Sequence, residues 1–204
     1  MDRIRIIGGE RLKGMIPISG AKNAALPLMI ASLLTRETLT LKNVPRLADV
    51  TLLGRILGNH GVDITVVGKK AGQSTIDGQT FKLKAAEIVD TTAPYEMVSR
   101  MRASFWVLAP ILARCGEADV ALPGGDNIGS RGLDMHVAGL ERLGATVRSE
   151  HGYLIATRDD QLRGASVWLD FPSVGATENL LMAAVLAKGT TVIDNAAREP
   201  EICD

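Results

Sequence analysis

The segment "PISGAKNAALP" (17–27) places Lys22 and Asn23 where an expected strand leads into an apolar helix. The first N–H groups of a helix have no partner within the helix and carry a partial positive charge. With a lysine beside them, they can bind phosphate or carboxylate groups. The spacing alone leaves open a solvated surface lysine, and the segment does not match a Walker loop.

A second segment, "LDFPSVGATENLLMAA" (169–184), repeats this geometry and offers the N–H groups of Ser173 and Val174. Arg100 and Arg102 precede another apolar helix in "SRMRASFWVLAPILAR". There they could bind phosphate in a bidentate manner or simply flank the helix. Two such junctions and two arginines together suit a substrate with several negative charges, such as a nucleotide sugar or an enol phosphate.

The segment "LPGGDNIGSRGLDMH" (122–136) is rich in glycine and leads into a helix near Leu133. Glycines give the backbone the freedom that a lid over an active site needs. Asp126 could then act as an acid, with Arg131 and Asp134 at the far end of the loop. The spacing alone leaves open a flexible turn that has no chemical role.

The composition is that of an ordinary globular protein and argues against several function classes. Lysine plus arginine (23) balances aspartate plus glutamate (23), and aromatic residues make up only 3%. Without a basic excess or stacking aromatics, nucleic-acid and membrane-surface roles are disfavoured. The longest apolar run (24–34) is too short to span a bilayer, and the N-terminus lacks the apolar core of a secretory signal. We therefore expect a cytoplasmic protein with no nucleic-acid or membrane partner.

The cysteines and histidines show no spacing typical of a metal site. Cys115 and Cys203 are expected to be free thiols in a reducing cytoplasm. His60, His136 and His151 fall in different copies of the repeat described next. We therefore expect no metal.

The elements that must hold the candidate residues recur along the chain. "ASLLTRETLTLKN" (31–43) and "AAVLAKGTTVIDN" (183–195) align without gaps, and Asn43 matches Asn195. A weaker copy, "APILARCGEADVALPGG" (109–125), lies between them, so the copies start roughly 75 residues apart. Each copy predicts the end of a buried helix, a tight turn and a strand.

A second element recurs in phase with the first. "ADVTLLGRILGNHGVDITV" (48–66) and "LDMHVAGLERLGATVRS" (133–149) each predict an amphipathic helix that ends at a glycine, followed by a strand and a hairpin. Helices that are apolar on nearly every side, such as 23–34 and 176–187, must be buried. The pattern favours an α/β fold with buried helices and outer sheets, while an ordinary α/β sandwich stays open.

The last residues, "NAAREPEICD", are predicted to begin a helix at Pro200. Because a domain seldom ends by starting a helix, we expect the chain to be a piece of a longer protein.

Six segments occur together and in order: "GAKNAALP", "MRASFWVLAP", "LPGGDNIGSR", "LDMH", "PSVGATENLLMAA" and "NAAREPEI". In this combination the chain, from residue 1 to 204, resembles the UDP-N-acetylglucosamine 1-carboxyvinyltransferase family of enolpyruvyl transferases. Members transfer the enolpyruvyl group of phosphoenolpyruvate to the 3-hydroxyl of UDP-N-acetylglucosamine and release phosphate. This is the first committed step of bacterial peptidoglycan synthesis. The resemblance implies these two substrates, no cofactor, and a considerably longer chain.

The implied fold is an inside-out α/β barrel, in which repeated helix–strand–helix–strand–strand units bury their helices and place their sheets outside. By this resemblance, residues 1–21 are a strand region of the domain completed by the missing C-terminal half. Residues 22–204 form most of the other domain and carry the catalytic loop (122–132). Because the substrate cleft lies between the two domains, the missing half is the expected partner, and the isolated chain is expected to be inactive.

The resemblance also implies which residues act. Lys22 and Asn23 would contact phosphoenolpyruvate, with Lys22 also catalytic, and Arg102 would reach the substrate phosphates. Asp126 occupies the position of the catalytic acid of the loop. The residues that would bind the nucleotide are Arg131, Gly132, Leu133, Asp134, Met135, Phe171, Pro172, Ser173 and Val174.

Three positions depart from the usual family pattern. Most members have cysteine where Asp126 stands and proline where Gly132 stands, and many have lysine where Phe171 stands. For protonation near pH 7, an aspartate pKa of about 3.9 must rise by roughly three units, at a cost of about 4 kcal/mol. Closure over anionic substrates would raise it. A carboxylate is a weaker nucleophile than a thiolate. We therefore expect resistance to fosfomycin, which alkylates the loop thiol of cysteine-type members.

Two other functions stay open. The related transferase that acts on shikimate 3-phosphate shares the fold, although "LPGGDNIGSR" and "NAAREPEI" argue against it. A non-catalytic half that only binds a nucleotide sugar belongs to a different functional class, and a turnover assay would separate it from an enzyme.

Overall fold

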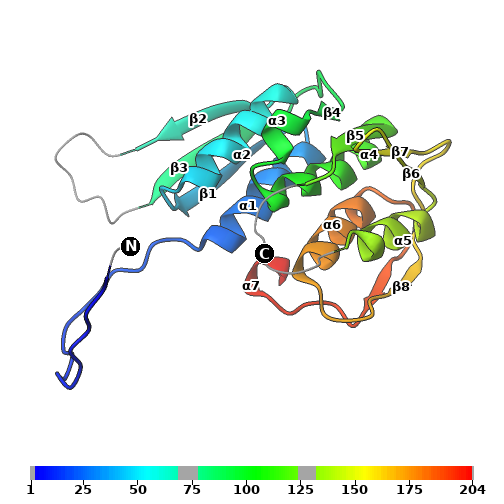
Figure 1. Cartoon of the computed structure of the whole chain (residues 1–204). Helices are drawn as coiled ribbons and strands as arrows, with labels where there is room; N and C mark the ends of the chain where they lie inside the picture. Colours follow the sequence, from blue (N-terminus) through cyan, green and yellow to red (C-terminus); the bar gives the residue numbers. More distant parts are fainter. Residues whose placement is uncertain (1–2, 69–77, 124–131, 204) are drawn as a thin grey trace.

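Three β-sheets lie on the outside of a group of buried helices (Figure 1). The computed structural model describes residues 3–68, 78–123 and 132–203. The strands are β1 (Thr38–Val44), β2 (Asp63–Val67), β3 (Gln79–Lys84), β4 (Thr92–Ala93), β5 (Glu117–Ala121), β6 (Thr146–Glu150), β7 (Tyr153–Thr157), β8 (Ser166–Trp168) and β9 (Val192–Asp194). The α-helices are α1 (Lys22–Ile30), α2 (Ala48–Asn59), α3 (Tyr95–Val98), α4 (Leu108–Cys115), α5 (Asp134–Arg142), α6 (Val174–Val185) and α7 (Pro200–Cys203). Two 3-10 helices are η1 (Ala31–Leu34) and η2 (Arg102–Val107).

The sheets follow the expected repeat. The first has the strand order β1-β3-β2 and is antiparallel throughout. The second has the order β4-β5-β7-β6, in which only β4 and β5 run parallel. The third pairs β8 with β9 in parallel. β2 and β6 each keep most of their residues exposed, as strands on the outside of a fold do.

Backbone conformations confirm the repeat at single residues. Gly61 and Gly144, which end α2 and α5, adopt left-handed φ angles of 91° and 98°. These conformations carry little steric cost only for glycine. Asn43 and Asn195, which match in the sequence repeat, adopt φ angles of 59° and 57°. Asparagine is one of the few other residues that tolerates this conformation. Residues that match in the sequence repeat therefore adopt the same backbone conformation near the ends of β1 and β9.

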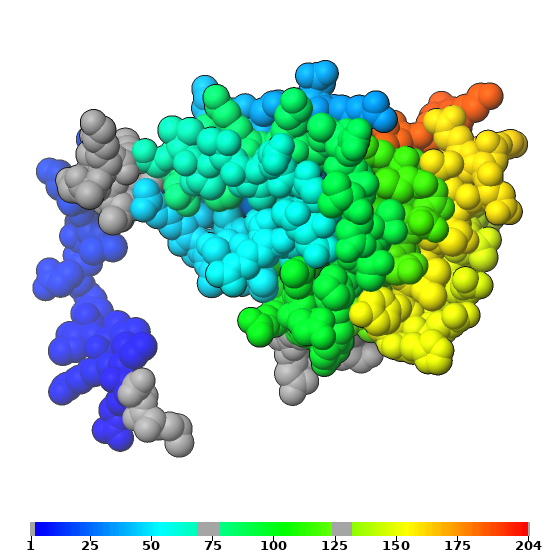
Figure 2. Space-filling view, turned by 90° about the horizontal axis from the view of Figure 1, so that it is seen from above, coloured from blue at the N-terminus to red at the C-terminus, as the bar shows by residue number. Residues whose placement is uncertain are grey.

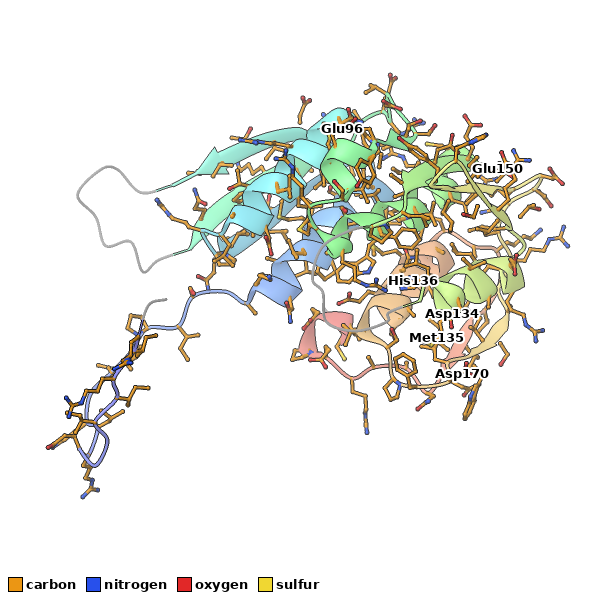
Figure 3. All side chains as sticks on the ribbon, viewed as in Figure 1. Glu96, Asp134, Met135, His136, Glu150 and Asp170 are labelled. Carbon is orange, nitrogen blue, oxygen red and sulfur yellow. The ribbon has the colours of Figure 1, made fainter. Side chains whose placement is uncertain are left out.

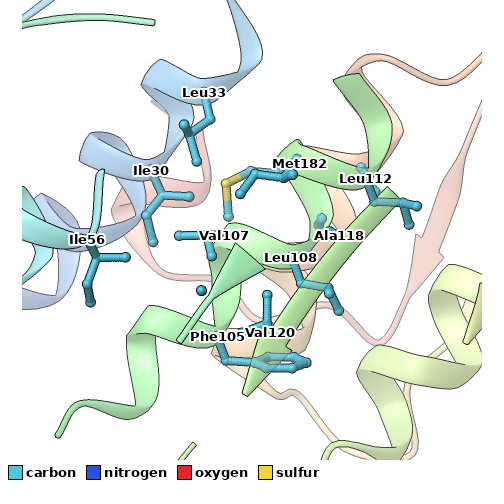
Figure 4. Packing of buried hydrophobic residues seen from close by; sticks show 14 of the residues in the cluster. Ile30, Leu33, Ile56, Phe105, Val107, Leu108, Leu112, Ala118, Val120 and Met182 are labelled. Atoms are coloured by element: carbon cyan, nitrogen blue, oxygen red, sulfur yellow. The ribbon is translucent and has the colours of Figure 1, made fainter. Parts of the chain in front are cut away.

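The core lies between α1, α4 and α6, three helices that the sequence predicted to be buried. Figure 4 shows Ile30 and Leu33 facing Val107, Leu108 and Met182 across the middle of this core. All five side chains are at most 6% exposed. Burying side chains of this kind contributes about 1.5–3 kcal/mol each, so the helix interior dominates the stability of the fold.

The guanidinium of Arg114, near the end of α4, ties three segments of the core together. Its Nη1 donates to the carbonyls of Leu33 and Thr35 at 3.0 and 3.2 Å. Its Nη2 donates to the carbonyls of Ala85 and Ala86 at 2.6 and 3.0 Å. One planar cation thereby satisfies four carbonyls that no helix or strand pairs.

The expected helix over 23–34 is present, and its last segment, 31–34, is a 3-10 helix. Residues 3–21 form no strand in this structure, and their expected place as a strand region of a second domain stays a prediction. This N-terminal segment projects from the body (Figures 1 and 2), and its isoleucines Ile4, Ile6, Ile7, Ile16 and Ile18 are 81–87% exposed.

Candidate functional site

A cleft of about 870 Å³ lies where α1, η2, α5, α6 and α7 come together. Ten of the residues implied by the family resemblance line it: Lys22, Asn23, Arg102, Gly132, Asp134, Met135, Phe171, Pro172, Ser173 and Val174. Leu133 does not line it and packs against the hydrophobic core instead. Asp126 and Arg131 lie outside the described residues. Residues from four distant parts of the chain thus meet at one surface.

Two helices begin at the cleft. Ala21, which precedes α1, makes no side-chain hydrogen bond to cap it, and the first N–H groups of a helix have no partner within the helix. At α6, the Ser173 hydroxyl accepts a hydrogen bond from the N–H of Ala176 at 3.3 Å. The N–H groups before Ala176, at the first turn, have no partner within the helix. Both helix starts therefore favour an anion in the cleft.

The glycine of "SVGA" has a steric role at this place. A Cβ atom at Gly175 would lie 3.0 Å from Nε1 of Trp106, which also lines the cleft. Real Cβ contacts are seldom so short, so glycine lets the start of α6 lie directly against the indole ring.

Three cations line the cleft. Lys22 forms an ion pair with Asp49 at 2.6 Å, with side chains 49% and 34% exposed. Arg102 donates a hydrogen bond from Nη2 to the carbonyl of Gly132 at 3.2 Å. Arg100 lines the same cleft. Lysine and arginine side chains can neutralise an anionic ligand, and Arg102 also connects the cleft to the segment that leads into α5.

Gly132 lies against the first residue of α5, Asp134. A Cβ atom at position 132 would meet the carboxylate of Asp134, so this flexible side chain would have to shift. A carboxylate in the first turn of a helix is favoured by the helix dipole. Figure 3 shows Asp134, Met135 and His136 together at this end of α5.

His136 is a buried neutral imidazole at the edge of the cleft. It is 5% exposed, and its Nδ1 lies 3.1 Å from the amide nitrogen of Asn179. Because an amide nitrogen only donates, Nδ1 is the acceptor and the ring proton is on Nε2. Burial, and then the charge of Arg102, lower the pKa of His136 to about 4, against a smaller opposing effect of Asp134. The Phe105 ring lies against the imidazole in a T-shaped arrangement, with a centroid distance of 5.4 Å and an interplanar angle of 89°.

Glu178 is the other buried titratable group of the cleft. Its side chain is 4% exposed, and both carboxyl oxygens lack a hydrogen-bond partner among the described residues. Burial, and then the nearby carboxylates of Glu201 and Glu199, raise the pKa of Glu178 to about 8. It is therefore mostly protonated at neutral pH.

Sequence analysis did not place several lining residues in the site. These are Leu26, Asp49, Met101, Ala103, Trp106, His136, Glu178, Glu199 and Glu201. "NAAREPEI" was part of the resemblance, and its two glutamates could have been found there. The pairing of His136 with Asn179 joins residues far apart in the chain, which no local pattern reports.

The chain that forms this cleft matches a known family over nearly its whole length. The family model described as "EPSP synthase (3-phosphoshikimate 1-carboxyvinyltransferase)" matches residues 6–204. The chain belongs to the EPSP synthase family. Two relatives within it are named UDP-N-acetylglucosamine 1-carboxyvinyltransferase: that of Methylobacterium radiotolerans is 63% identical and that of Xanthobacter autotrophicus is 62% identical over 204 residues. Each alignment covers 100% of this chain and 48% of the relative. The chain thus spans about half the length of these curated relatives.

Solved structures of the EPSP synthase family share the fold. The enolpyruvyl transferase NikO from Streptomyces tendae matches with a TM-score of 0.73 at 22% identity, over 97% of this chain and 44% of that one. EPSP synthase from Acinetobacter baumannii matches with a TM-score of 0.65 at 17% identity, over 96% and 43%. The inside-out α/β fold is therefore confirmed.

Two features are absent from the part of the chain that the structure describes. None of its helices combines the length and apolar character that crossing a bilayer requires. Within the same residues, no three His, Cys, Asp or Glu side chains are grouped so as to hold a metal ion.

Proposed function

We propose that the protein to which this chain belongs transfers the enolpyruvyl group of phosphoenolpyruvate to the 3-hydroxyl of UDP-N-acetylglucosamine in the bacterial cytoplasm. This is the first committed step of peptidoglycan synthesis. The observation that carries the proposal is the cleft itself, where two helix starts and three cationic side chains face one volume. The relatives named for this reaction, at 63% identity, support these substrates over shikimate 3-phosphate.

The reaction needs the charges that the cleft supplies. The sugar 3-hydroxyl adds to C2 of phosphoenolpyruvate and loses its proton to a base, while an acid protonates C3. The resulting tetrahedral ketal then loses phosphate from C2 and a proton from C3. Lys22 and Arg102 would neutralise the phosphate and carboxylate as charge develops. Asp126 would supply the C3 proton.

We also infer how the domains divide. Residues 22–204 would form most of one domain, and residues 1–21 would be a strand region of a second domain completed by a C-terminal half. The exposed isoleucines support this, because Ile4 and Ile6, like Ile16 and Ile18, alternate with a period of two, as in a strand. Such a strand would bury them when it pairs with the second domain.

The test is phosphate release from phosphoenolpyruvate with UDP-N-acetylglucosamine as acceptor. It is measured on the 204-residue chain and on the full-length protein, meaning this chain continued to the length of its relatives. We expect turnover only in the full-length protein, and none with shikimate 3-phosphate. Tight binding of UDP-N-acetylglucosamine without turnover in the full-length protein would instead support a non-catalytic binding protein.

A matched pair of variants tests the role of the cleft. Lys22→Gln in the full-length protein should lower kcat/KM by about two orders of magnitude, because charge stabilisation of the transition state is lost. Lys42→Gln removes the same charge from the exposed residue Lys42 of β1 and should leave kcat/KM unchanged. Equal effects of both substitutions would contradict a specific role for Lys22.

A further inference from the structure

The carboxyl group of Glu178 is buried in the wall of the cleft without a partner. Glu178 lies in the second turn of α6, is 4% exposed and lines the cleft. Neither Oε1 nor Oε2 has a hydrogen-bond partner within residues 3–68, 78–123 and 132–203. Native proteins pair nearly all such buried polar atoms, and an unpaired carboxyl that lines a cleft can form hydrogen bonds to a bound molecule.

The surroundings of Glu178 decide which chemistry that group has. Glu199 and Glu201 line the same cleft and are the charges that act on Glu178. Two neighbouring carboxylates repel an anion, so a phosphate is disfavoured at this place. Burial and these two charges keep Glu178 protonated at neutral pH, since its pKa is raised to about 8. A protonated carboxyl both donates and accepts a hydrogen bond.

We propose that Glu178 forms a subsite for an uncharged polar group of the bound sugar, a hydroxyl or amide that both donates and accepts hydrogen bonds. The assignment rests on the proposed nucleotide-sugar function. Lys22, Arg100 and Arg102 serve the anionic parts of the ligands, and the acidic wall around Glu178 receives the neutral sugar. The charge pattern of the cleft thereby orients a molecule that is anionic at one end and neutral at the other.

The experiment compares two ligands that differ only in the sugar. UDP and UDP-N-acetylglucosamine are titrated calorimetrically into the full-length protein and its Glu178 variants. Glu178→Gln keeps a donor and an acceptor, so its Kd for UDP-N-acetylglucosamine should stay within about threefold of wild type. Glu178→Met has similar volume but no hydrogen bonds, and this Kd should rise about tenfold or more. The Kd for UDP should stay within about twofold in both variants.

Controls separate this subsite from general damage. Glu141→Met makes the same exchange at an exposed residue of α5 and should change neither Kd. Glu178→Ala, measured alongside, keeps the test valid where Glu178→Met does not fold. An unchanged Kd for UDP-N-acetylglucosamine in the apolar variants, or an equal loss for both ligands, would overturn the sugar subsite. A wild-type protein that binds neither ligand would instead refute the proposed function.

Discussion

Replacing Glu178 by glutamine should stabilise the protein, and the gain should grow with pH. The pKa of Glu178 rises from its ordinary value of 4.5 to about 8 on folding, chiefly because the carboxyl is buried. The folded state therefore keeps a proton that the unfolded state has lost between these two values. Wild-type stability must fall as pH rises from 4.5 towards 8. Glutamine stays neutral in both states and escapes this loss.

The size of the effect follows from the shift. One pKa unit corresponds to about 1.4 kcal/mol, so the interval between the ordinary pKa and pH 7 corresponds to about 3 kcal/mol. This is a large share of the roughly 5–15 kcal/mol by which a domain is stable. The other charged groups that line the cleft are present in both the wild-type and the Glu178→Gln protein. They are Lys22, Asp49, Arg100, Arg102, Asp134, Glu199 and Glu201.

The assay is urea denaturation of the wild-type and Glu178→Gln proteins at pH 5, 6, 7 and 8. The difference in unfolding free energy should be small at pH 5 and approach about 3 kcal/mol at neutral pH. Glu141→Gln, at an exposed position of α5, should show no such trend. A difference that stays constant across the series would refute a protonated Glu178, because an ionised and paired carboxylate makes the glutamine variant less stable at every pH in this range.

Three further predictions concern other parts of the chain. Asn179→Asp should move the ring proton of His136 to Nδ1 and raise the pKa of His136. A carboxylate accepts a hydrogen bond where the amide nitrogen now donates one. Unchanged 15N chemical shifts of the His136 ring in NMR would contradict this. Arg114→Lys should cost about 2 kcal/mol of unfolding free energy in urea, because one ammonium group cannot reach four carbonyls; wild-type stability would show that the four bonds are dispensable. In the full-length protein, Asp126→Asn should abolish turnover. Asp126→Cys should create sensitivity to fosfomycin, with the drug adduct visible by mass spectrometry. An adduct that forms readily on the wild-type protein would refute the distinction between carboxylate and thiol.

Periodicity predicted most of the fold, because the fold repeats its own elements. The left-handed turns at Asn43 and Asn195 lie where the sequence repeat aligns them, and Gly61 and Gly144 end their helices as expected. The local sequence could not predict β4, because a strand of two residues is too short to show alternating apolar and polar side chains. It is defined by its pairing with β5. The strand region expected within residues 1–21 stays a prediction, because a strand forms only beside a partner and the expected partner belongs to a second domain.

The site was predicted in part, and the limits have a physical cause. The segments that carry the family resemblance contain Lys22, Arg102 and Ser173, and all three residues line the cleft. Protonation states depend on burial and on charges brought together by folding. Neither the neutral state of His136 nor that of Glu178 can be derived from neighbours in the chain.

Helix α6 shows how one short sequence can supply several chemical environments. Residues four apart lie on the same face of a helix, so Glu178 lies one turn below Val174, and both line the cleft. Asn179 lies one turn below Gly175, in the buried layer where it orients His136. The helix start favours an anion, and the next turn presents a neutral acid, Glu178, and an amide, Asn179, that pairs with the neutral imidazole of His136. A change at the helix start should therefore weaken phosphate binding, while a change one turn below should alter only how the uncharged part of the ligand is held.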